Sequence, residues 1–338
     1  LARADELAAR LTLWNNAEAD ADLPADQAMI RWGEVFNQSV ALHVSPLSVA
    51  KQFRAEVFSQ KRTWIFTSAT LAVKGDFSHY QQELGLTASV DEFDPDPASQ
   101  KPVVTAQWLS PFDFPNRALL LVPESLPLPN TADHTRAVVE EALPLIEAAK
   151  GRTFLLFTSL RAMNEAHAML KSHFDEKGWT FPLMVQGEGT RTELLDRFRH
   201  LGNAVLVASH SFWEGVDVKG QALSVVVIDK LPFSPPDDPL LAARLAAIEN
   251  AGGNPFMEYQ VPHAAIVLKQ GAGRLIRDET DSGVLMIGDR RLIDKSYGRR
   301  IWQSLPPMRR TRQAQEAVEF LMQTLVHAPA TEPPADVA

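Results

Sequence analysis

The sequence predicts an α/β fold in which a parallel sheet carries helices on both faces. From about residue 130 onward, short apolar runs rich in Val and Ile alternate with longer amphipathic stretches. Strands that are apolar at successive positions are typical of parallel sheets buried on both faces. Clusters of polar residues also follow several of these runs directly, and open α/β sheets bind ligands at the carboxyl ends of their strands.

The second half of the chain supplies the regular part of this pattern. Short apolar runs predict strands at Thr153–Thr158, Leu183–Gln186, Ala204–Ala208, Ser224–Asp229 and Val284–Gly288. Helical spacing of apolar residues predicts helices at Thr131–Ala149, Arg161–Phe174, Arg191–His200, Leu240–Asn250, Val261–Arg277 and Gln313–Leu325. The Ala- and Pro-rich tail, residues 326–338, is expected to be disordered.

The first 130 residues are less regular. Residues 1–30 are expected to be the end of a helical element, because Leu7, Leu11 and Trp14 keep a helical spacing. Apolar runs then predict strands at Val40–Ser45, Trp64–Ser68, Val103–Leu109 and Ala118–Val122, and an amphipathic pattern predicts a helix at Leu47–Phe58. Prolines cluster within residues 123–129 and predict a domain boundary there.

Composition excludes several classes of site. The 338 residues contain no cysteine, which excludes disulfides, a cysteine nucleophile and cysteine-ligated metal clusters within this chain, and fits a cytoplasmic location. No apolar run reaches membrane-spanning length. The net charge of −9 gives no overall basic surface for nucleic acid, but residues 290–312 hold eight Lys and Arg against one Asp and could line a local phosphate groove.

The stretch Gln270–Arg277, of sequence QGAGRLIR, carries the strongest chemical signal. As a helix it would place Gln270, Arg274 and Arg277 on one face, at positions i, i+4 and i+7. Two glycines in one turn leave the backbone open to close approach, although each costs roughly 1 kcal/mol in a helix. Two fixed guanidinium groups beside an amide suit the grip on a polyphosphate during phosphoryl transfer. The alternative is an ordinary buried helix with two surface arginines.

Polar clusters follow four of the predicted strands, as a shared ligand surface would require. They are Thr67–Thr70, Thr158–Ser159, Ser209–Asp217 and Lys230–Phe233. Each has a plainer alternative, since Ser and Thr after a strand often cap a helix, and Glu214 and Asp217 could flank a solvated turn. Capping and phosphate contact are compatible, because hydroxyls and free amides at a helix start also bind phosphate. The sequence contains no H-E-x-x-H, no G-x-S-x-G and no G-x-x-x-x-G-K-[ST] phosphate loop.

Taken in order, these clusters resemble the motifs of superfamily 2 DNA helicases of the XPD/DinG type, and among them the DinG/YoaA-like proteins. The matching segments are Thr67–Leu71 for motif III, Leu156–Ser159 for motif IV, Phe212–Asp217 for motif V and Gln270–Arg277 for motif VI. The resemblance covers roughly residues 40–320. It implies a RecA-like (P-loop NTPase-like) fold, with a complete helicase lobe 2 and a partial lobe 1.

The resemblance also implies roles for individual residues. Arg277 would be the arginine finger that stabilises charge on the transferring phosphate, and Arg274 and Gln270 would contact the γ-phosphate of ATP. The residues implied in ATP binding, or in coupling hydrolysis to movement, are Asp217, Glu214, Gly215, Gly273, Ser68 and Thr70. Those implied in DNA contact, through backbone binding or base stacking, are Thr158, Ser159, Arg152, Trp213 and Lys230.

Departures from the family pattern shape the expected organisation. Family members begin with a Walker A lobe, four cluster-ligating cysteines and an acidic metal-binding motif, none of which occurs in this sequence. We therefore expect a C-terminal fragment that does not hydrolyse ATP and binds no cofactor by itself. Its parts would be the end of an arch-like helical insertion at 1–30, a piece of lobe 1 at 31–122, lobe 2 at 123–325 and the tail.

For the full protein, the resemblance implies an ATP-dependent 5′–3′ DNA helicase of repair or replication, using ATP, Mg²⁺ and a 4Fe–4S cluster in the missing N-terminal part. The implied partners are single-stranded DNA and, through the C-terminal region, the chi subunit of DNA polymerase III, with no membrane. One alternative of another class stays open: a non-catalytic docking module for nucleic acid or protein. Arg274 and Arg277 favour the enzyme, because a docking module has no need of both.

Overall fold

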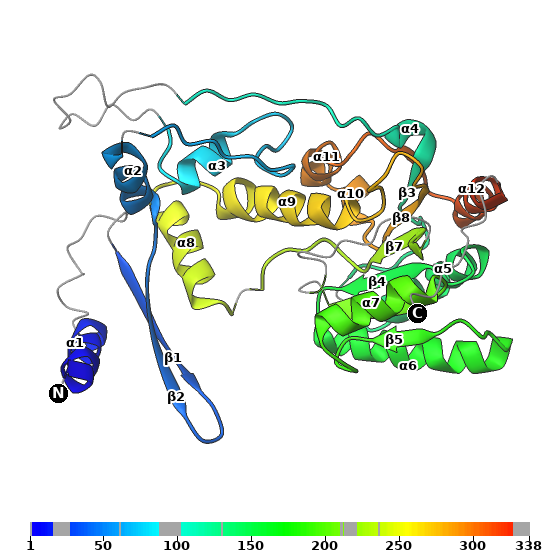
Figure 1. Cartoon of the computed structure of the whole chain (residues 1–338), viewed down its shortest axis with the longest axis horizontal. Coiled ribbons are helices and arrows are strands. Elements are labelled where there is room, and N and C mark those ends of the chain that lie inside the picture. Colours follow the sequence, from blue (N-terminus) through cyan, green and yellow to red (C-terminus); the bar gives the residue numbers. More distant parts are fainter. Residues whose placement is uncertain are drawn as a thin grey trace, which may run out of the picture. The chain divides into compact units, whose positions relative to one another are not determined.

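The computed structural model describes residues 2–15, 28–60, 62–87, 103–129, 131–209, 212, 222–235 and 237–326 (Figure 1). The chain divides into two compact units. The first contains Leu1–Trp108 and Phe233–Pro262, and the second contains Leu109–Pro232 and His263–Ala338. Each unit is described by itself. Among the described residues, no helix combines the length and the apolar character needed to cross a membrane.

A seven-stranded sheet forms the centre of the second unit, and every paired neighbour in it is parallel. Its strands are β3 (Ala118–Leu121), β4 (Thr153–Phe157), β5 (Leu183–Val185), β6 (Val205–Ser209), β7 (Val225–Ile228), β8 (Gly283–Ile287) and β9 (Arg309–Thr311). They lie in the order β5-β6-β4-β7-β8-β3-β9. The predicted parallel α/β fold is confirmed, and the five strands expected after residue 150 all form.

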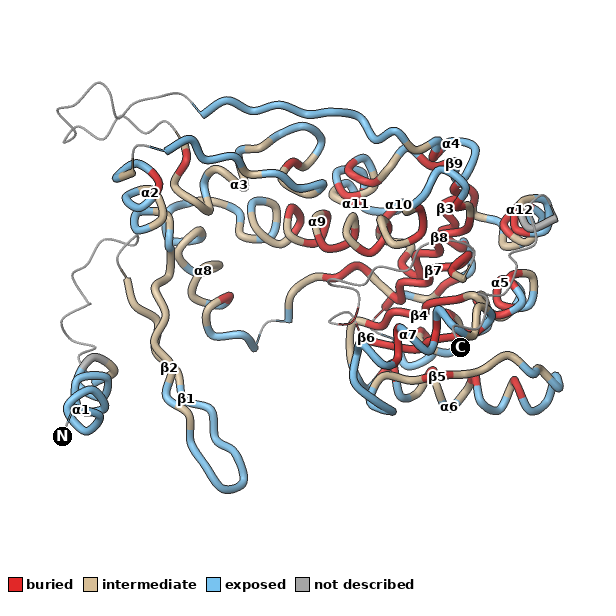
Figure 2. The backbone as a smooth tube through the Cα atoms, in the orientation of Figure 1, coloured by how far each residue is buried: buried red, intermediate tan, exposed pale blue. Residues whose placement is uncertain are grey.

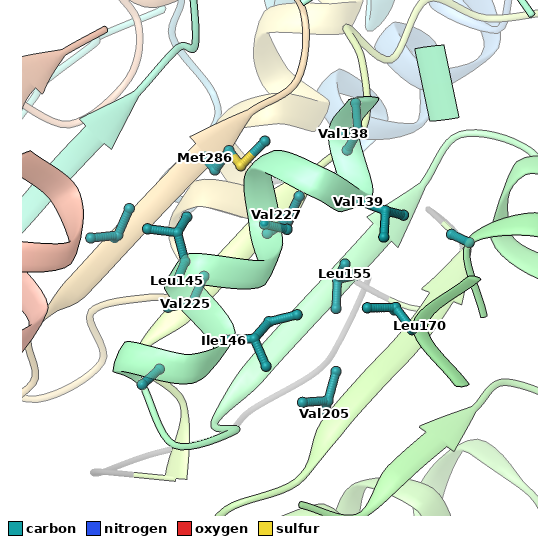
Figure 3. Close-up of a cluster of buried hydrophobic side chains, with 14 of the residues drawn as sticks. Val138, Val139, Leu145, Ile146, Leu155, Leu170, Val205, Val225, Val227 and Met286 are labelled. Carbon is teal, nitrogen blue, oxygen red and sulfur yellow. The ribbon is translucent and has the colours of Figure 1, made fainter. Parts of the chain in front are cut away.

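Helices cover both faces of this sheet. On one face, α5 (His134–Ala148), α6 (Leu160–Lys177) and α12 (Ala314–Val326) share a buried cluster with alternate strand residues. Figure 3 shows Leu145 and Ile146 of α5 lying over Leu155 and Val225 of the sheet. On the other face, Phe198 of α7 (Arg191–Leu201) packs on Phe154, with ring centroids 4.5 Å apart.

Both sets of alternating side chains on the central strands are therefore buried, as the red strands of Figure 2 indicate. This explains why the strands read as continuous apolar runs instead of alternating ones. The remaining elements of the unit are α4 (Phe114–Arg117), α9 (Val261–Ala272), α10 (Arg291–Asp294) and α11 (Ser296–Trp302).

The sheet takes one strand from the region assigned by sequence to the preceding domain. β3 pairs with β8 on one side and with β9 on the other, so the boundary expected at residues 123–129 lies inside the second unit. The strand predicted at Val103–Leu109 does not form. That segment is irregular, and Val104 is 88% exposed, because no neighbouring strand among the described residues pairs with it.

The first unit contains a hairpin of β1 (Met29–Val35) and β2 (Val40–Pro46), together with α1 (Ala2–Asn15), α2 (Ala50–Ser59) and α3 (Ser78–Glu83). The sequence predicted β2 and α2 but not β1. The strand predicted at Trp64–Ser68 is wrong, since the segment is irregular and Ile65 is 79% exposed. Its central Phe66 packs instead against the rings of Phe53 and Tyr80.

Residues 233–262 fold with this first unit, although the sequence placed them in the second domain. They form α8 (Pro239–Asn250) and the short helical turn Phe256–Gln260. Arg244 of α8 donates to the Leu47 carbonyl at 3.3 Å and to the Tyr259 hydroxyl at 3.0 Å, and pairs with Glu83 at 3.6 Å. One guanidinium group thus ties three distant stretches of sequence together.

Candidate functional site

The carboxyl edge of the seven-stranded sheet brings together described residues from three of the predicted polar clusters. β4 ends before Thr158 and Ser159, β6 ends at Ser209, and β7 ends before Asp229 and Lys230. Because β6, β4 and β7 are neighbouring parallel strands, their ends meet at one edge. Thr158, Ser159, Ser209 and Lys230 therefore lie along one edge of the sheet within this unit.

A buried carboxylate fixes the loop after β4. Asp229 accepts a hydrogen bond from the Thr158 backbone N–H at 2.9 Å and another from the Thr158 hydroxyl at 3.2 Å. Burial raises the pKa of Asp229 from 3.8 to about 7, against the opposing effect of Lys230 and the hydrogen bonds. The carboxyl group therefore changes charge near neutral pH. Thr158 contributes two neutral donors to it and no positive charge.

A second carboxylate fixes the loop after β7 in the same manner. Asp289, fully buried at the end of β8, accepts from the Leu231 N–H at 2.9 Å. It also forms a salt bridge with Arg291, whose Nη2 lies 2.7 Å from Oδ2 and whose Nε lies 3.0 Å from Oδ1. The fork of the guanidinium matches the two carboxylate oxygens, which is the geometry of a strong charge-assisted pair.

Smaller contacts hold the rest of this edge. Ser159 caps α6 by accepting from the Ala162 N–H at 3.3 Å, so the capping alternative holds for this residue. Gln186 accepts from both the N–H and the hydroxyl of Ser209, at 2.8 and 2.9 Å. His134 donates from Nε2 to the Gly288 carbonyl at 2.8 Å, and burial lowers its pKa below 6.5.

The arginine-bearing stretch is not one helix, as the sequence suggested. α9 ends at Ala272, and the following turns tighten, with the Arg274 N–H bonded to the Gly271 carbonyl at 3.1 Å. Gln270 is helical, whereas Arg274 and Arg277 lie in the loop beyond. The prediction of one shared helix face is therefore wrong, and the glycines that disfavour helix at this point account for the early end.

This arginine loop, defined as Gly273–Asp281, is nevertheless firmly held. Leu275 and Ile276 are 2% and 3% exposed and anchor it in the core. Asp281, which is buried, accepts from the N–H groups of Arg277 and Asp278 at 2.8 and 2.9 Å. The result is two half-buried guanidinium groups on a backbone fixed from both sides, which is what stabilisation of a developing phosphate charge requires.

The arginine loop and Arg152 both lie at the amino edge of the sheet, opposite to Thr158. A Cβ on Gly283, the first residue of β8, would lie 2.8 Å from Leu275 Cδ1 and would clash with the Ser224 carbonyl. Arg152 accepts from the Ser224 N–H at 2.8 Å through its carbonyl, and its guanidinium donates to the Ala149 carbonyl at 2.7 Å. The structure thus separates Arg152 from Thr158, Ser159 and Lys230 by about the 16 Å length of a five-residue strand.

Comparison with known proteins shows the family of the chain. Residues 142–308 match the model of the helicase C-terminal domain. The ATP-dependent DNA helicase YoaA of Haemophilus influenzae is 44% identical over 290 residues, covering 86% of this chain and 42% of that protein. The chain carries the C-terminal part of an XPD/DinG-type helicase. The resemblance drawn from the four motifs is confirmed.

Two further relatives show the same partial overlap. The ATP-dependent DNA helicase YoaA of Escherichia coli is 44% identical over 292 residues, which cover 86% of the chain and 43% of the relative. The ATP-dependent helicase DinG of Mycobacterium tuberculosis is 38% identical over 274 residues, which cover 81% of the chain and 39% of the relative. The chain thus spans about two fifths of the length of the curated relatives it matches.

Other predicted helicase residues are placed elsewhere or not described. Ser68 and Thr70 belong to the first unit, where the Ser68 hydroxyl lies 3.1 Å from that of Thr70 and also accepts from its N–H. From motif V the structure describes only Phe212, which is buried and lies under the Arg191 guanidinium. The predicted residues Trp213, Glu214, Gly215 and Asp217 lie outside the described residues.

Three carboxylates that organise the site were given no role by sequence reasoning. Asp229, Asp281 and Asp289 each fix a loop that carries a predicted functional residue, or its immediate neighbour. A polar residue at the end of a fully apolar strand was a usable signal for Asp229 and Asp289, because a buried carboxylate needs partners. Within the described ranges, no group of three or more His, Asp and Glu side chains could hold a metal ion.

Proposed function

We propose that this chain is the C-terminal part of an ATP-dependent DNA helicase that couples ATP hydrolysis to movement along single-stranded DNA. The observation that carries the proposal is the arginine loop: Arg274 and Arg277 are held by Leu275, Ile276 and Asp281 at a fixed place on a helicase C-terminal domain. The names of the relatives, ATP-dependent DNA helicases, support the same activity.

In this proposal Arg277 stabilises charge on the transferring phosphate of ATP, while Arg274 and Gln270 contact the γ-phosphate. The donor chemistry fits, because guanidinium groups bind phosphate oxygens through paired N–H donors. The phosphate loop and Mg²⁺ ligands would come from the part of the longer protein that this chain does not span. Thr158, Ser159 and Lys230, at the opposite edge, would receive the DNA backbone.

The finer features of the family complete the proposal. They are 5′–3′ polarity, a repair or replication role, a 4Fe–4S cluster in the N-terminal part and association with the chi subunit through the C-terminal region. Ala317, Phe320 and Leu321 of α12 are buried in the core of the sheet unit, so that face is not available to dock a partner. The candidate for that association is the opposite face, where Met322 is 55% exposed.

Replacing Arg277 with Ala in the full-length protein tests the central assignment. We expect DNA-stimulated ATP hydrolysis to fall by about 10³-fold or more, because an arginine finger contributes about 10³–10⁵ in rate. The affinity for single-stranded DNA should stay within a few-fold of wild type. The matched control is Arg300→Ala, an exposed arginine of α11, which should hydrolyse ATP normally.

Unchanged hydrolysis by Arg277→Ala would show that Arg277 is not the finger. Absence of ATP hydrolysis from the wild-type full-length protein itself, with DNA binding retained, would instead support the docking module.

A further inference from the structure

Thr158 cannot serve as a simple phosphate ligand in the state that the structure shows. Its backbone N–H and its hydroxyl both lie within hydrogen-bond distance of Asp229, at 2.9 and 3.2 Å. A threonine hydroxyl has one proton to donate, and an ionised carboxylate can only accept. While Asp229 is ionised, both donors of Thr158 are therefore directed away from any DNA phosphate.

Protonation of Asp229 reverses the direction of one of these bonds. A protonated Oδ2 donates its proton to Thr158 Oγ1 across the same distance, while Oδ1 continues to accept from the Thr158 N–H. The threonine hydroxyl then turns its own proton outward. One proton is taken from solvent, no covalent bond between heavy atoms changes, and the edge gains one donor for a phosphate oxygen.

We propose that Asp229 is a positioning residue whose protonation releases the Thr158 hydroxyl to donate to a phosphate of bound single-stranded DNA. This rests on the proposed function, in which the carboxyl edge receives the DNA backbone. Binding of DNA at this edge is then accompanied by proton uptake.

The surroundings of Asp229 suit such a switch. It is buried, and burial raises its pKa to about 7, so a modest change in its environment shifts the proton. The charged group that acts on Asp229 is Lys230, next in sequence. The Asp289–Arg291 pair follows the neighbouring strand β8, and His134 of α5 bonds the Gly288 carbonyl there, where burial lowers the pKa of the imidazole. A DNA phosphate arriving at this edge adds negative charge, which favours the protonated carboxyl group further.

The neighbouring carboxylate, Asp289, has a guanidinium group as its partner. Asp289 holds Leu231 through the same kind of bond, but its charge is neutralised by the bidentate pair with Arg291. Asp229 instead bonds a side chain that can reverse its donor. We therefore place the proton-dependent hydrogen bond at Asp229 and Thr158, where the ends of the neighbouring strands β7 and β4 meet, and not at Asp289.

The test measures the affinity of the full-length protein for a fluorescent oligothymidylate between pH 6 and pH 8.5 at constant salt. Wild-type affinity should fall by about tenfold as pH rises through 7, the loss expected for one hydrogen bond to a charged group. Asp229→Asn mimics the protonated state, because its amide can donate to Thr158 Oγ1 while its oxygen accepts from the N–H. It should bind with the low-pH affinity throughout. Thr158→Val keeps the carboxylate but lacks the hydroxyl, so it should bind at the weaker level throughout.

The matched control is Asp294→Asn, which makes the same charge change at an exposed salt bridge and should keep the wild-type pH profile. Calorimetry in two buffers of different ionisation enthalpy should show proton uptake for wild type and Asp294→Asn, less uptake for Thr158→Val, which keeps the carboxylate but lacks the hydroxyl, and none for Asp229→Asn. A merely structural role for Asp229 would not move this readout.

A wild-type pH profile and proton uptake in Asp229→Asn would overturn this inference and leave the proposed function standing. If Asp229→Asn fails to fold, a wild-type pH profile together with wild-type proton uptake in Thr158→Val would overturn the inference equally. Absence of DNA binding by wild type at every pH would refute the proposed function as well.

Discussion

The ends of β7 and β8 carry buried carboxylates on neighbouring strands, yet they stabilise their charges differently. Asp289 of the β8 end is paired with Arg291, whereas Asp229 of the β7 end is bonded to Thr158 and has its pKa raised to about 7 by burial. Both fix the backbone of the adjacent loop. Both buried aspartates therefore hold a loop by accepting from a backbone N–H. They differ in whether a guanidinium group pairs with the carboxylate, and only Asp229, without such a pair, has its pKa raised to about 7.

Removing the paired carboxylate should have the largest effect on stability. Asp289→Ala leaves the Leu231 N–H without its acceptor and Arg291 without its counter-charge, so we expect a loss of about 3–5 kcal/mol in the free energy of unfolding. Denaturant unfolding of the sheet unit measures it. The control Asp294→Ala breaks a more exposed pair and should cost less than about 1 kcal/mol. Equal losses in the two variants would contradict the comparison.

Neutralising Asp229 should change the free energy of unfolding in the opposite direction. The folded pKa of Asp229 is raised to about 7 from 3.8, so the folded state holds the proton more tightly than the unfolded chain. The contribution of protonated Asp229 to stability is full below about pH 4 and is lost as pH rises to about 7. Asp229→Asn should therefore be more stable than wild type by about 2–4 kcal/mol at pH 8, since one pKa unit corresponds to about 1.4 kcal/mol.

Thermal unfolding of both proteins at pH 8 and pH 5 checks this prediction. The gain should shrink markedly at pH 5, where the folded wild-type carboxyl group is already protonated. A variant that is less stable than wild type at pH 8 would show that the ionised form is the one the fold favours.

The smallest expected change in the free energy of unfolding concerns α6, the helix that follows Thr158. Ser159→Ala removes the N-cap of α6 and should cost about 1 kcal/mol, as should Thr190→Ala at the capping box of α7. Denaturation curves give the two costs. If Ser159 also touches DNA, only Ser159→Ala should weaken oligothymidylate binding. Equal DNA affinity in both variants would show that Ser159 caps α6 and does not contact DNA.

Much of the sheet could be predicted from the sequence, because β4, β6, β7 and β8 are buried on both faces and their residues are almost all apolar. For the arginine loop, the sequence predicted which residues could bind phosphate but not the backbone conformation that carries them. Gln270, Arg274 and Arg277 keep helical spacing, yet the helix ends at Ala272, where glycines weaken it and Leu275 and Ile276 enter the core beyond.

Segments whose structure depends on distant partners were predicted least well. Trp64–Ser68 and Val103–Leu109 have strand composition, but a strand forms only where another strand pairs with it, and the described residues offer none. Residues 233–262 fold with the first unit, where Arg244 donates to the Leu47 carbonyl and pairs with Glu83. The order of apolar and polar residues within a segment does not indicate which distant segments it will contact.

The sequence by itself determined the parallel α/β class, the strands β4 to β8 and the four motifs that mark an XPD/DinG-type helicase, but not β9. These follow from local apolar runs and from residue order. Only the tertiary structure decided that β3 joins this sheet, that the arginine loop lies at the edge opposite Thr158, and that Asp229 holds both donors of Thr158. Each of those outcomes depends on which strands become neighbours, and pairing between distant segments is chosen by the packing of the whole unit.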